Sequence, residues 1–163
     1  MLNSILFNQL LYGTEEQVMT EQEKWDYILA LDEELLIGGV ILSEWSTFLA
    51  RDAENAFCAG AHLSAILAAQ AAVESHLRYE YFDPAESKGW GLFQLLDRAP
   101  VPNDLKDDLH TLRCFRNQWV HVGDPSEDSH LLEKPEYHEA KLEEMAKLAI
   151  RSMLRVLYLE QFV

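Results

Sequence analysis

Three polar side chains lie close together in the stretch RCFRNQWVHVGDP, which runs from Arg113 to Pro125. Arg116, Asn117 and His121 are residue types that the cleavage of RNA by its own 2′-hydroxyl would need. A histidine can transfer protons near neutral pH, because its reference pKa is about 6.5. An arginine offers a planar fork that fits phosphate oxygens, and an asparagine amide can orient a phosphate or a hydroxyl. The stretch therefore predicts a phosphate-handling catalytic site that needs no metal and no other cofactor.

The spacing of these residues decides how they can work together. In a helix that turns about 100° per residue, Asn117 and His121 differ by about 40°, whereas Arg116 and His121 diverge by about 140°. Such a spread suits a cleft shared with an opposing surface, such as the same helix of a second subunit, so we expect a homodimer. The alternative is a polar helix end, where the arginine and asparagine are solvated and the histidine interacts with the last carbonyls.

One acidic residue is a candidate for a supporting role. Glu74 lies in the centre of an alanine-rich stretch, and from a facing helix its carboxylate could orient His121 or Arg116. The alternative is an ordinary ion pair with Arg78, four residues later, which would stabilise the helix by a few tenths of a kcal/mol.

Several basic residues are candidates for contacts with RNA. Arg113 lies three residues before Arg116 and could extend its positive patch, or else form a surface ion pair with Asp108 or with a glutamate elsewhere. On the final helix, basic residues recur every four positions and predict a ridge that could follow an RNA backbone: Lys147, Arg151 and Arg155. The alternative is a ridge that is solvated or paired within the molecule, with Glu143 placed to pair with Lys147.

The elements that must position these residues are predicted to be helices. From Glu23 to Leu49 apolar residues recur at steps of three and four, which indicates one helix, bent at Gly38 and Gly39. An alanine-rich helix is expected over residues 53–82. Further helices are expected at three places: a short one in GWGLFQLLDR, one from Pro102 and Asn103 to a stop at Gly123, and a long one from Tyr137 to Phe162.

Helix starts are also signalled near the N-terminus. Thr14 with Gln17 and Thr20 with Glu23 both have the spacing of a capping box. The fold class predicted from these patterns is all-α, an antiparallel bundle of four to five main helices with a short extra helix. Because the 163 residues show no repeat and no long linker, we expect a single domain, with residues 1–34 as an N-terminal helical extension.

The charge of the chain limits how it can meet RNA. Its formal net charge is −15, and broad, sequence-blind binding of nucleic acid depends instead on many lysines and arginines. The excess is uneven, because residues 1–52 hold ten acidic and two basic residues whereas residues 102–124 hold four and three. Any contact with RNA is therefore expected to be local.

The composition also favours a soluble protein of the cytosol. Cys58 and Cys114 have no metal-ligand spacing and lie in apolar helical runs, where a free thiol behaves as a small hydrophobe. The first residues lack the basic region and cleavage site of a signal peptide, and LLIGGVIL is much shorter than the roughly 20 apolar residues that span a membrane.

The segment LRCFRNQWVHVGD resembles the signature of the HEPN superfamily, in which an arginine followed by a polar residue precedes a histidine by four to six positions near the end of a bundle helix. In this chain the matching residues are Arg116, Asn117 and His121. The order of the surrounding helices is also similar, so the resemblance covers roughly residues 35 to 160. The departures are the strong acidity of the chain and the poor match of its first 34 residues, which could form an added helix that covers the cleft or binds a partner.

The resemblance implies a bundle of four or five helices that forms a homodimer through the motif helix. It implies a metal-independent endoribonuclease that acts on single-stranded RNA in toxin–antitoxin, phage-defence or RNA-processing settings, with an antitoxin or another regulatory protein as a partner. Other members of the superfamily have lost catalysis, so the alternative is a non-catalytic module that binds RNA or a protein.

Overall fold

The computed structural model describes residues 18–121 and 131–162, and over these ranges the chain forms helices, turns and one isolated bridge. The helices in these ranges are α2 (Glu21–Leu35), α3 (Glu44–Cys58), α4 (His62–Tyr81), α5 (Leu92–Arg98), α6 (Asn103–Val120) and α7 (Pro135–Leu157). Five of them are long, and α5 has 7 residues. The predicted all-α bundle of four to five main helices with a short extra helix is therefore confirmed.

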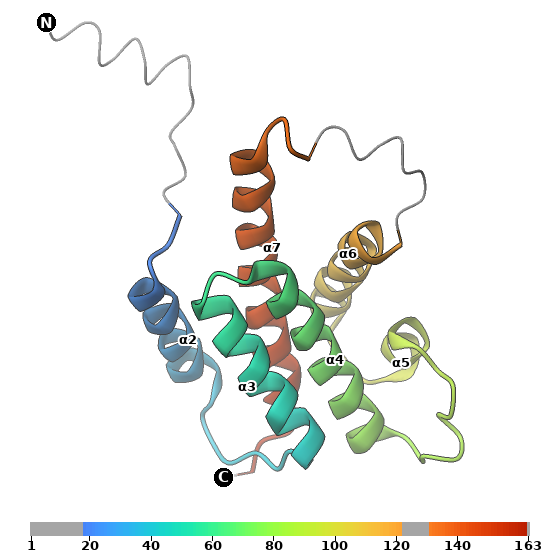
Figure 1. Cartoon of the computed structure of the whole chain (residues 1–163). Coiled ribbons are helices and arrows are strands. Elements are labelled where there is room, and N and C mark those ends of the chain that lie inside the picture. The colour runs from blue at the N-terminus through green and yellow to red at the C-terminus, as the bar shows by residue number, and fades with distance from the viewer. Residues whose placement is uncertain (1–17, 122–130, 163) are drawn as a thin grey trace, which may run out of the picture.

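The helices are arranged around α4 and α7, as Figure 1 shows. Helices α3 and α4 form an antiparallel pair at the front, α7 runs behind them, α2 lies on one side, and α6 with α5 lies on the other. The alanines of α4 allow α7 to approach closely, because Ala65, Ala69 and Ala72 are each no more than 1% exposed. Larger buried side chains such as Phe57 and Ile150 fill the rest of the core.

The prediction of one continuous helix from Glu23 to Leu49 is wrong, because α2 ends at Leu35 and α3 begins at Glu44. The backbone of Gly39 pairs with Phe162 near the C-terminus through two hydrogen bonds of 2.8 and 3.0 Å, and α3 starts afresh after Ser43. A Cβ at Gly38 would lie only 2.6 Å from the carbonyl oxygen of Phe162, so this approach of two backbones requires a glycine. A tertiary contact with the C-terminus has therefore overridden the local helical pattern.

Other boundaries also differ from the prediction. The expected helix over residues 53–82 is interrupted after Cys58 by a turn in which Gly60 has a φ of +78°, a left-handed value that favours glycine. Helix α7 ends at Leu157, because the chain beyond it turns to reach Gly39. The capping box at Thr20 is confirmed. The expected box at residues 14–17 and the stop at residue 123 lie outside the described residues.

Two smaller expectations concern the membrane and the cysteines. No helix within residues 18–121 or 131–162 combines the length and the apolar character needed to cross a membrane. Both cysteines are free thiols, but only Cys58 is buried as a small core residue, whereas Cys114 is exposed on α6.

Candidate functional site at the end of helix α6

The packing of α6 against the rest of the bundle sets the positions of Arg116, Asn117 and His121 at its C-terminal end. Its apolar stripe, Leu105, Leu109 and Leu112, is fully buried, and the carbonyl of Leu112 accepts a hydrogen bond of 2.9 Å from Nε2 of Gln70 on α4. The stripe therefore faces the core that α6 shares with α4 and α7. Arg116 follows Leu112 by four residues, so it continues the same stripe for one more turn, where the side chain is only half-buried.

Arg116 and Asn117 are brought together by side-chain hydrogen bonds. Nε and Nη2 of Arg116 donate to Oδ1 of Asn117 at 3.3 and 3.0 Å. Because a guanidinium only donates, the amide oxygen must face it, and the NH2 group of Asn117 is left without a partner in the described part of the chain. The pair therefore presents several N–H donors to an outside acceptor.

The guanidinium of Arg116 has no carboxylate partner in the part of the chain that the structure describes. Although the chain has 28 acidic residues, Arg116 contacts no carboxylate within the described ranges. Other arginines do form ion pairs, as Arg78 does with Glu74 and Arg151 does with Glu34. An amide in place of a carboxylate orients a guanidinium without cancelling its charge, which suits an anion-binding role.

His121 caps the helix and does not continue it. Its backbone has φ −117° and ψ 83°, and its N–H donates to the carbonyl of Asn117 at 3.0 Å. The helical angle predicted between Arg116 and His121 therefore does not apply. The imidazole is exposed and has no partner among residues 18–121 and 131–162, so the terminal carbonyls are contacted by the backbone of His121 and not by its ring.

Arg113 lies against helix α5. Its guanidinium carbon is 5.4 Å from the centre of the Phe93 ring, and Nη2 lies 3.7 Å from Sγ of Cys114. The expected alternative, an ion pair with Asp108, is not formed, because Asp108 contacts Arg155. Arg113 is thus placed on the α5 side of α6, and no hydrogen bond joins it to Arg116.

Glu74 forms an ion pair with Arg78, with 2.9 Å between Oε1 and Nη2. This pair was the alternative to a supporting role in the site. Arg78 also donates to the carbonyls of Ser87 and Trp90 and so fastens the loop before α5 to α4. No hydrogen bond or ion pair joins Glu74 to Arg116 or His121 in the described structure. The carboxylate of Glu74 therefore helps to hold Arg78, and through it the loop before α5.

The basic residues of α7 are engaged inside the molecule. Arg151 pairs with Glu34 of α2 at 2.6 Å, and Nζ of Lys147 lies 5.8 Å from the centre of the Tyr27 ring. Arg155 pairs with Asp104 of α6 at 2.6 Å. The ridge is thus covered from both sides, by α2 and by α6. The expected pair between Lys147 and Glu143 is replaced by a contact between Glu143 and Lys24.

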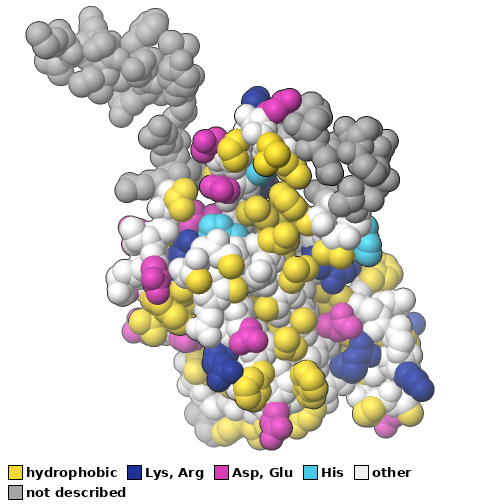
Figure 2. Space-filling model, in the orientation of Figure 1, with side chains coloured by type: hydrophobic (Ala, Val, Ile, Leu, Met, Phe, Trp, Pro, Cys, Tyr) yellow, Lys and Arg dark blue, Asp and Glu magenta, His cyan; other side chains and the backbone are white. Residues whose placement is uncertain are grey.

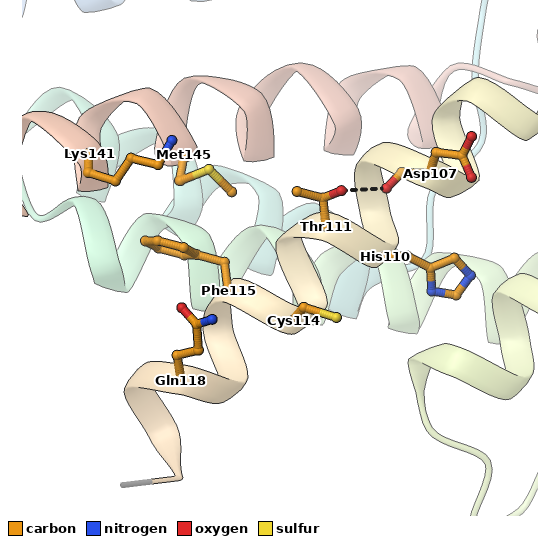
Figure 3. A pocket seen from close by; sticks show the side chains of 8 residues that line it. All are labelled: Asp107, His110, Thr111, Cys114, Phe115, Gln118, Lys141 and Met145. Carbon is orange, nitrogen blue, oxygen red and sulfur yellow. Dashed lines mark hydrogen bonds between the residues drawn. The ribbon is translucent and has the colours of Figure 1, made fainter. Parts of the chain in front are cut away.

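A groove between α6 and α7, seen from close by in Figure 3, was missed by sequence reasoning. Its volume is about 590 Å³, and eight side chains line it: Asp107, His110, Thr111, Cys114, Phe115, Gln118, Lys141 and Met145. The wall is apolar at Phe115 and Met145 and polar at Gln118 and Lys141, so a planar ring with hydrogen-bonding edges would fit its chemistry. Gln118 and Arg116 differ by about 160° around the helix, so the groove and the guanidinium lie on opposite flanks of α6.

A buried polar cluster on the α2 side of the bundle was also missed. Lys24 of α2 is 3% exposed, and its Nζ lies 3.0 Å from Nε2 of His62 and 3.4 Å from Oε1 of Glu143, which is 7% exposed. Burial, and secondarily the charge of Lys24, lowers the pKa of His62, while Glu143 opposes this shift. Only the three-dimensional fold brings these groups together, since they lie 38 and 81 residues apart along the chain.

Comparison with protein-family models, with curated proteins and with solved structures found no match. The function of this chain must therefore be inferred from its own side chains.

Proposed function

We propose that this protein is a cytosolic, metal-independent endoribonuclease of HEPN type that cleaves single-stranded RNA and acts as a homodimer. The observation that carries the proposal is the guanidinium of Arg116, which is half-exposed, held by the amide of Asn117 and left without a carboxylate partner in the described structure. An exposed imidazole follows one turn later at His121. These are the donors and the proton-transfer group that the 2′-hydroxyl route needs.

In the proposed reaction the ribose 2′-oxygen attacks the adjacent phosphorus while a base removes its proton. The bond between phosphorus and the 5′-oxygen breaks, and an acid gives a proton to this leaving oxygen, so the products are a 2′,3′-cyclic phosphate and a 5′-hydroxyl. His121 is the proton-transfer residue, with the copy from a second subunit available for the other step. Arg116 stabilises the charge that develops on the phosphorane oxygens, and Asn117 orients the phosphate or the hydroxyl.

The acidity of the chain fits a controlled enzyme of this kind. The net charge of −15 disfavours indiscriminate binding of RNA, since few phosphates can be neutralised. The proposed setting is a toxin–antitoxin or phage-defence system, in which an antitoxin or another regulatory protein controls the site. Binding of RNA is then a local event at the end of α6.

The decisive experiment is RNA cleavage by the purified protein in the presence of EDTA, with analysis of the product ends. Arg116→Ala and His121→Ala should each lower the cleavage rate by about 100-fold to 10,000-fold, because general acid–base catalysis and charge stabilisation contribute effects of this size. Arg51→Ala and His138→Ala are matched controls that should cleave like the wild type. Both residues lie on other helices, at α3 and α7.

Products that carry a 2′,3′-cyclic phosphate would support the 2′-hydroxyl route. Cleavage that survives in both motif variants, or that EDTA abolishes, would contradict the proposal. Toxicity on expression that disappears in Arg116→Ala and His121→Ala would indicate that the protein also cleaves RNA inside the cell.

A second candidate is a non-catalytic module that binds RNA or a partner protein. The observation that favours it is the internal pairing of the basic ridge, because Arg151 and Arg155 already contact Glu34 and Asp104. Such a module would bind RNA without cleaving it, and its binding would be the same in the His121→Ala variant. Binding measured beside cleavage therefore separates the two functions.

A further inference from the structure

Three buried polar side chains join α2 to the start of α4 and to α7. Nζ of Lys24 lies 3.0 Å from Nε2 of His62 and 3.4 Å from Oε1 of Glu143. The backbone N–H of Met19, just before α2, donates to the same Oε1 at 3.1 Å. In Figure 2 side chains of the histidine, basic and acidic classes lie beside one another on the α2 side of the molecule. We call Lys24, His62 and Glu143 the α2 cluster, because they hold the N-terminal end of this helix.

The C-terminal end of α2 is held in another way, by the last residues of the described chain. Oε1 of Gln161 accepts hydrogen bonds from the backbone N–H groups of Ile37 and Gly38, and Nε2 of Gln161 donates to the carbonyl of Leu35. Amide groups do not titrate near neutral pH. A change in pH therefore leaves these contacts intact and acts on the α2 cluster at the opposite end of the helix.

The α2 cluster requires a neutral imidazole at His62. An ammonium group only donates hydrogen bonds, so Nε2 of His62 needs a free lone pair to accept one from Lys24. Protonation of the imidazole would place two cations 3.0 Å apart. Water can reach the imidazole, because its side chain is 10% exposed and a pocket of about 480 Å³ opens beside it. The charge of His62 can therefore follow the pH of the solvent.

Each element packed around His62 contributes groups that act on its charge. Lys24 comes from α2, and the carboxylates of Glu139 and Glu143 come from α7, with Oε1 of Glu143 3.9 Å from Nε2. Helix α3 contributes the uncharged ring of Phe57, whose centre lies 6.3 Å from that of the imidazole.

The next residue of α3, Cys58, lies near Lys24 and stays a neutral thiol, since burial raises its pKa to about 11.

These groups together favour the neutral imidazole in the folded state. Burial and the ammonium group of Lys24 lower the pKa of His62, and the two carboxylates of α7 oppose this shift without reversing it. When α2 moves away, the imidazole binds a proton more readily than it does in the folded state. The hold on α2 is therefore complete above about pH 6.5 and weakens as pH falls below that value.

Helix α2 covers the basic ridge of α7. Arg151 pairs with Glu34 of α2 at 2.6 Å. Nζ of Lys147 lies 5.8 Å from the centre of the Tyr27 ring, and the hydroxyl of Tyr27 donates to the carbonyl of Lys147 at 3.3 Å. Departure of α2 would thus remove a carboxylate from one cation of the ridge and an aromatic ring from the other.

We propose that α2 is a pH-sensitive cover: protonation of His62 detaches the N-terminal end of α2 from α4 and α7 and uncovers Lys147 and Arg151. The C-terminal end of α2 stays attached through Gln161, so the helix is not lost from the molecule. The inference does not rest on RNA cleavage, and its test measures the position of α2 alone.

Two substitutions at one position imitate the two charge states. His62→Gln keeps a neutral acceptor for Lys24, whereas His62→Arg carries a permanent charge. A merely structural role of His62 would make both variants loosen α2. His138→Gln, on α7, is the matched control and should behave like the wild type.

Hydrogen–deuterium exchange of the full chain measures how often α2 opens. Exchange of α2, corrected for intrinsic rates, is compared with that of α4 at about pH 5.5 and about pH 7.5, on either side of the reference pKa of histidine. The wild type should match His62→Gln at the higher pH. At the lower pH its α2 should exchange about three to ten times faster than that of His62→Gln, the size of effect expected for two unit charges about 3 Å apart.

The comparison between variants is needed because other groups also titrate. His76 is buried in α4, and Glu54 of α3 has a raised pKa of about 7, but both are present in every variant. His62→Arg should show fast exchange of α2 at both pH values. The inference is overturned if the wild type and His62→Gln respond to pH alike, or if both substitutions loosen α2 at the higher pH.

Acylation of lysines tests the uncovering of the ridge at a single pH. At about pH 7.5, Lys24 and Lys147 should react about three to ten times faster with an acylating reagent in His62→Arg than in His62→Gln. Lys106 of α6 is the internal reference and should react alike in both, because α2 and α6 are not in contact. Mass spectrometry of the labelled peptides gives the rates. Equal rates at Lys147 in the two variants would show that α2 does not cover the ridge.

Discussion

Arg116 shows how a single residue can remain available for function in a chain dominated by acids. It continues a buried leucine stripe, yet it lies one turn past the last buried leucine, so its charge stays half-exposed. The amide of Asn117 holds the guanidinium through two hydrogen bonds. A carboxylate at the same place would hold it more strongly and would also neutralise it. The choice of an amide therefore favours binding of an external anion over stability.

Glu54 illustrates the opposite case, a charge that the fold disfavours. Burial, together with repulsion from Asp32 across the contact between α2 and α3, raises the pKa of Glu54 from 4.5 to about 7. The folded state therefore binds this proton more tightly than the unfolded chain does. The contribution of Glu54 to stability falls as pH rises from about 4.5 to about 7, and it stays low above that range.

Glu54→Gln should therefore stabilise the protein at alkaline pH and not at acid pH. We expect the free energy of unfolding to rise by about 1 to 2 kcal/mol at about pH 8, because the side chain is partly solvated and the full shift overstates the gain. Near pH 4 both proteins carry a neutral side chain and should unfold alike. The measurement is urea denaturation at both pH values. A gain of the same size at both would show that ionisation of Glu54 is not its cause.

At the scale of elements, α2 is attached to the bundle by polar contacts as well as by apolar ones. Its buried residues are Lys24, Ile28 and Leu31, so one of the three carries a charge. The hydroxyl of Tyr158 on α7 donates to Asp32 at 2.8 Å, and Arg151 pairs with Glu34. A helix held in this way depends on every partner being present, because a buried polar group that loses its partner is costly.

Lys24→Met should destabilise the protein by about 3 kcal/mol, since it leaves the buried carboxylate of Glu143 without its cation. The double variant with Glu143→Leu should recover most of this loss, because neither partner is then left unpaired. Unfolding of the two variants and of the wild type in urea gives the comparison. If the double variant is less stable than Lys24→Met, the attraction between Lys24 and Glu143 stabilises the fold by more than the burial of the two charges destabilises it. Lys106→Met, at a partly buried lysine of α6, is the control for loss of a lysine.

At the scale of the whole molecule, the excess of negative charge acts on stability and on assembly. Residues 1–52 hold ten acidic and two basic residues, and α2 carries much of this excess. Helix α7, in contrast, has its basic ridge paired with acids of α2 and α6. Self-repulsion of a net charge of −15 weakens the compact state, while it also keeps separate molecules apart wherever their acidic surfaces meet.

Salt should therefore raise the melting temperature. Between about 0.01 and 0.15 M NaCl the screening length falls from about 30 to about 8 Å, so repulsion between exposed acids is largely removed. We expect a rise of a few degrees in calorimetry, and a smaller rise in Glu33→Lys, which places a positive charge at an exposed position of α2. If salt leaves the melting temperature unchanged or lowers it, the ion pairs within the molecule stabilise the fold at least as much as repulsion between its acidic residues destabilises it.

Much of the helical pattern could be predicted from the sequence, because apolar periodicity and caps act over only a few residues. Helix α6 starts at the position that Pro102 and Asn103 predict. The capping box between Thr20 and Glu23 also forms as their spacing predicts. The prediction failed where distant residues meet. The pairing of Gly39 with Phe162 breaks a pattern that locally reads as one helix, and no local signal identifies the partner.

The sequence alone determined the fold class, the presence of an arginine, an asparagine and a histidine at one helix end, and the strong negative charge, since these depend on residue types and short spacings. Only the tertiary structure decided which charges are available. It pairs Arg151 with Glu34 and Arg155 with Asp104 across helices, and it leaves Arg116 without a carboxylate partner in the described part of the chain. The physical reason is that ion pairs form over distances of a few ångströms, and only packing of the helices sets which side chains come that close.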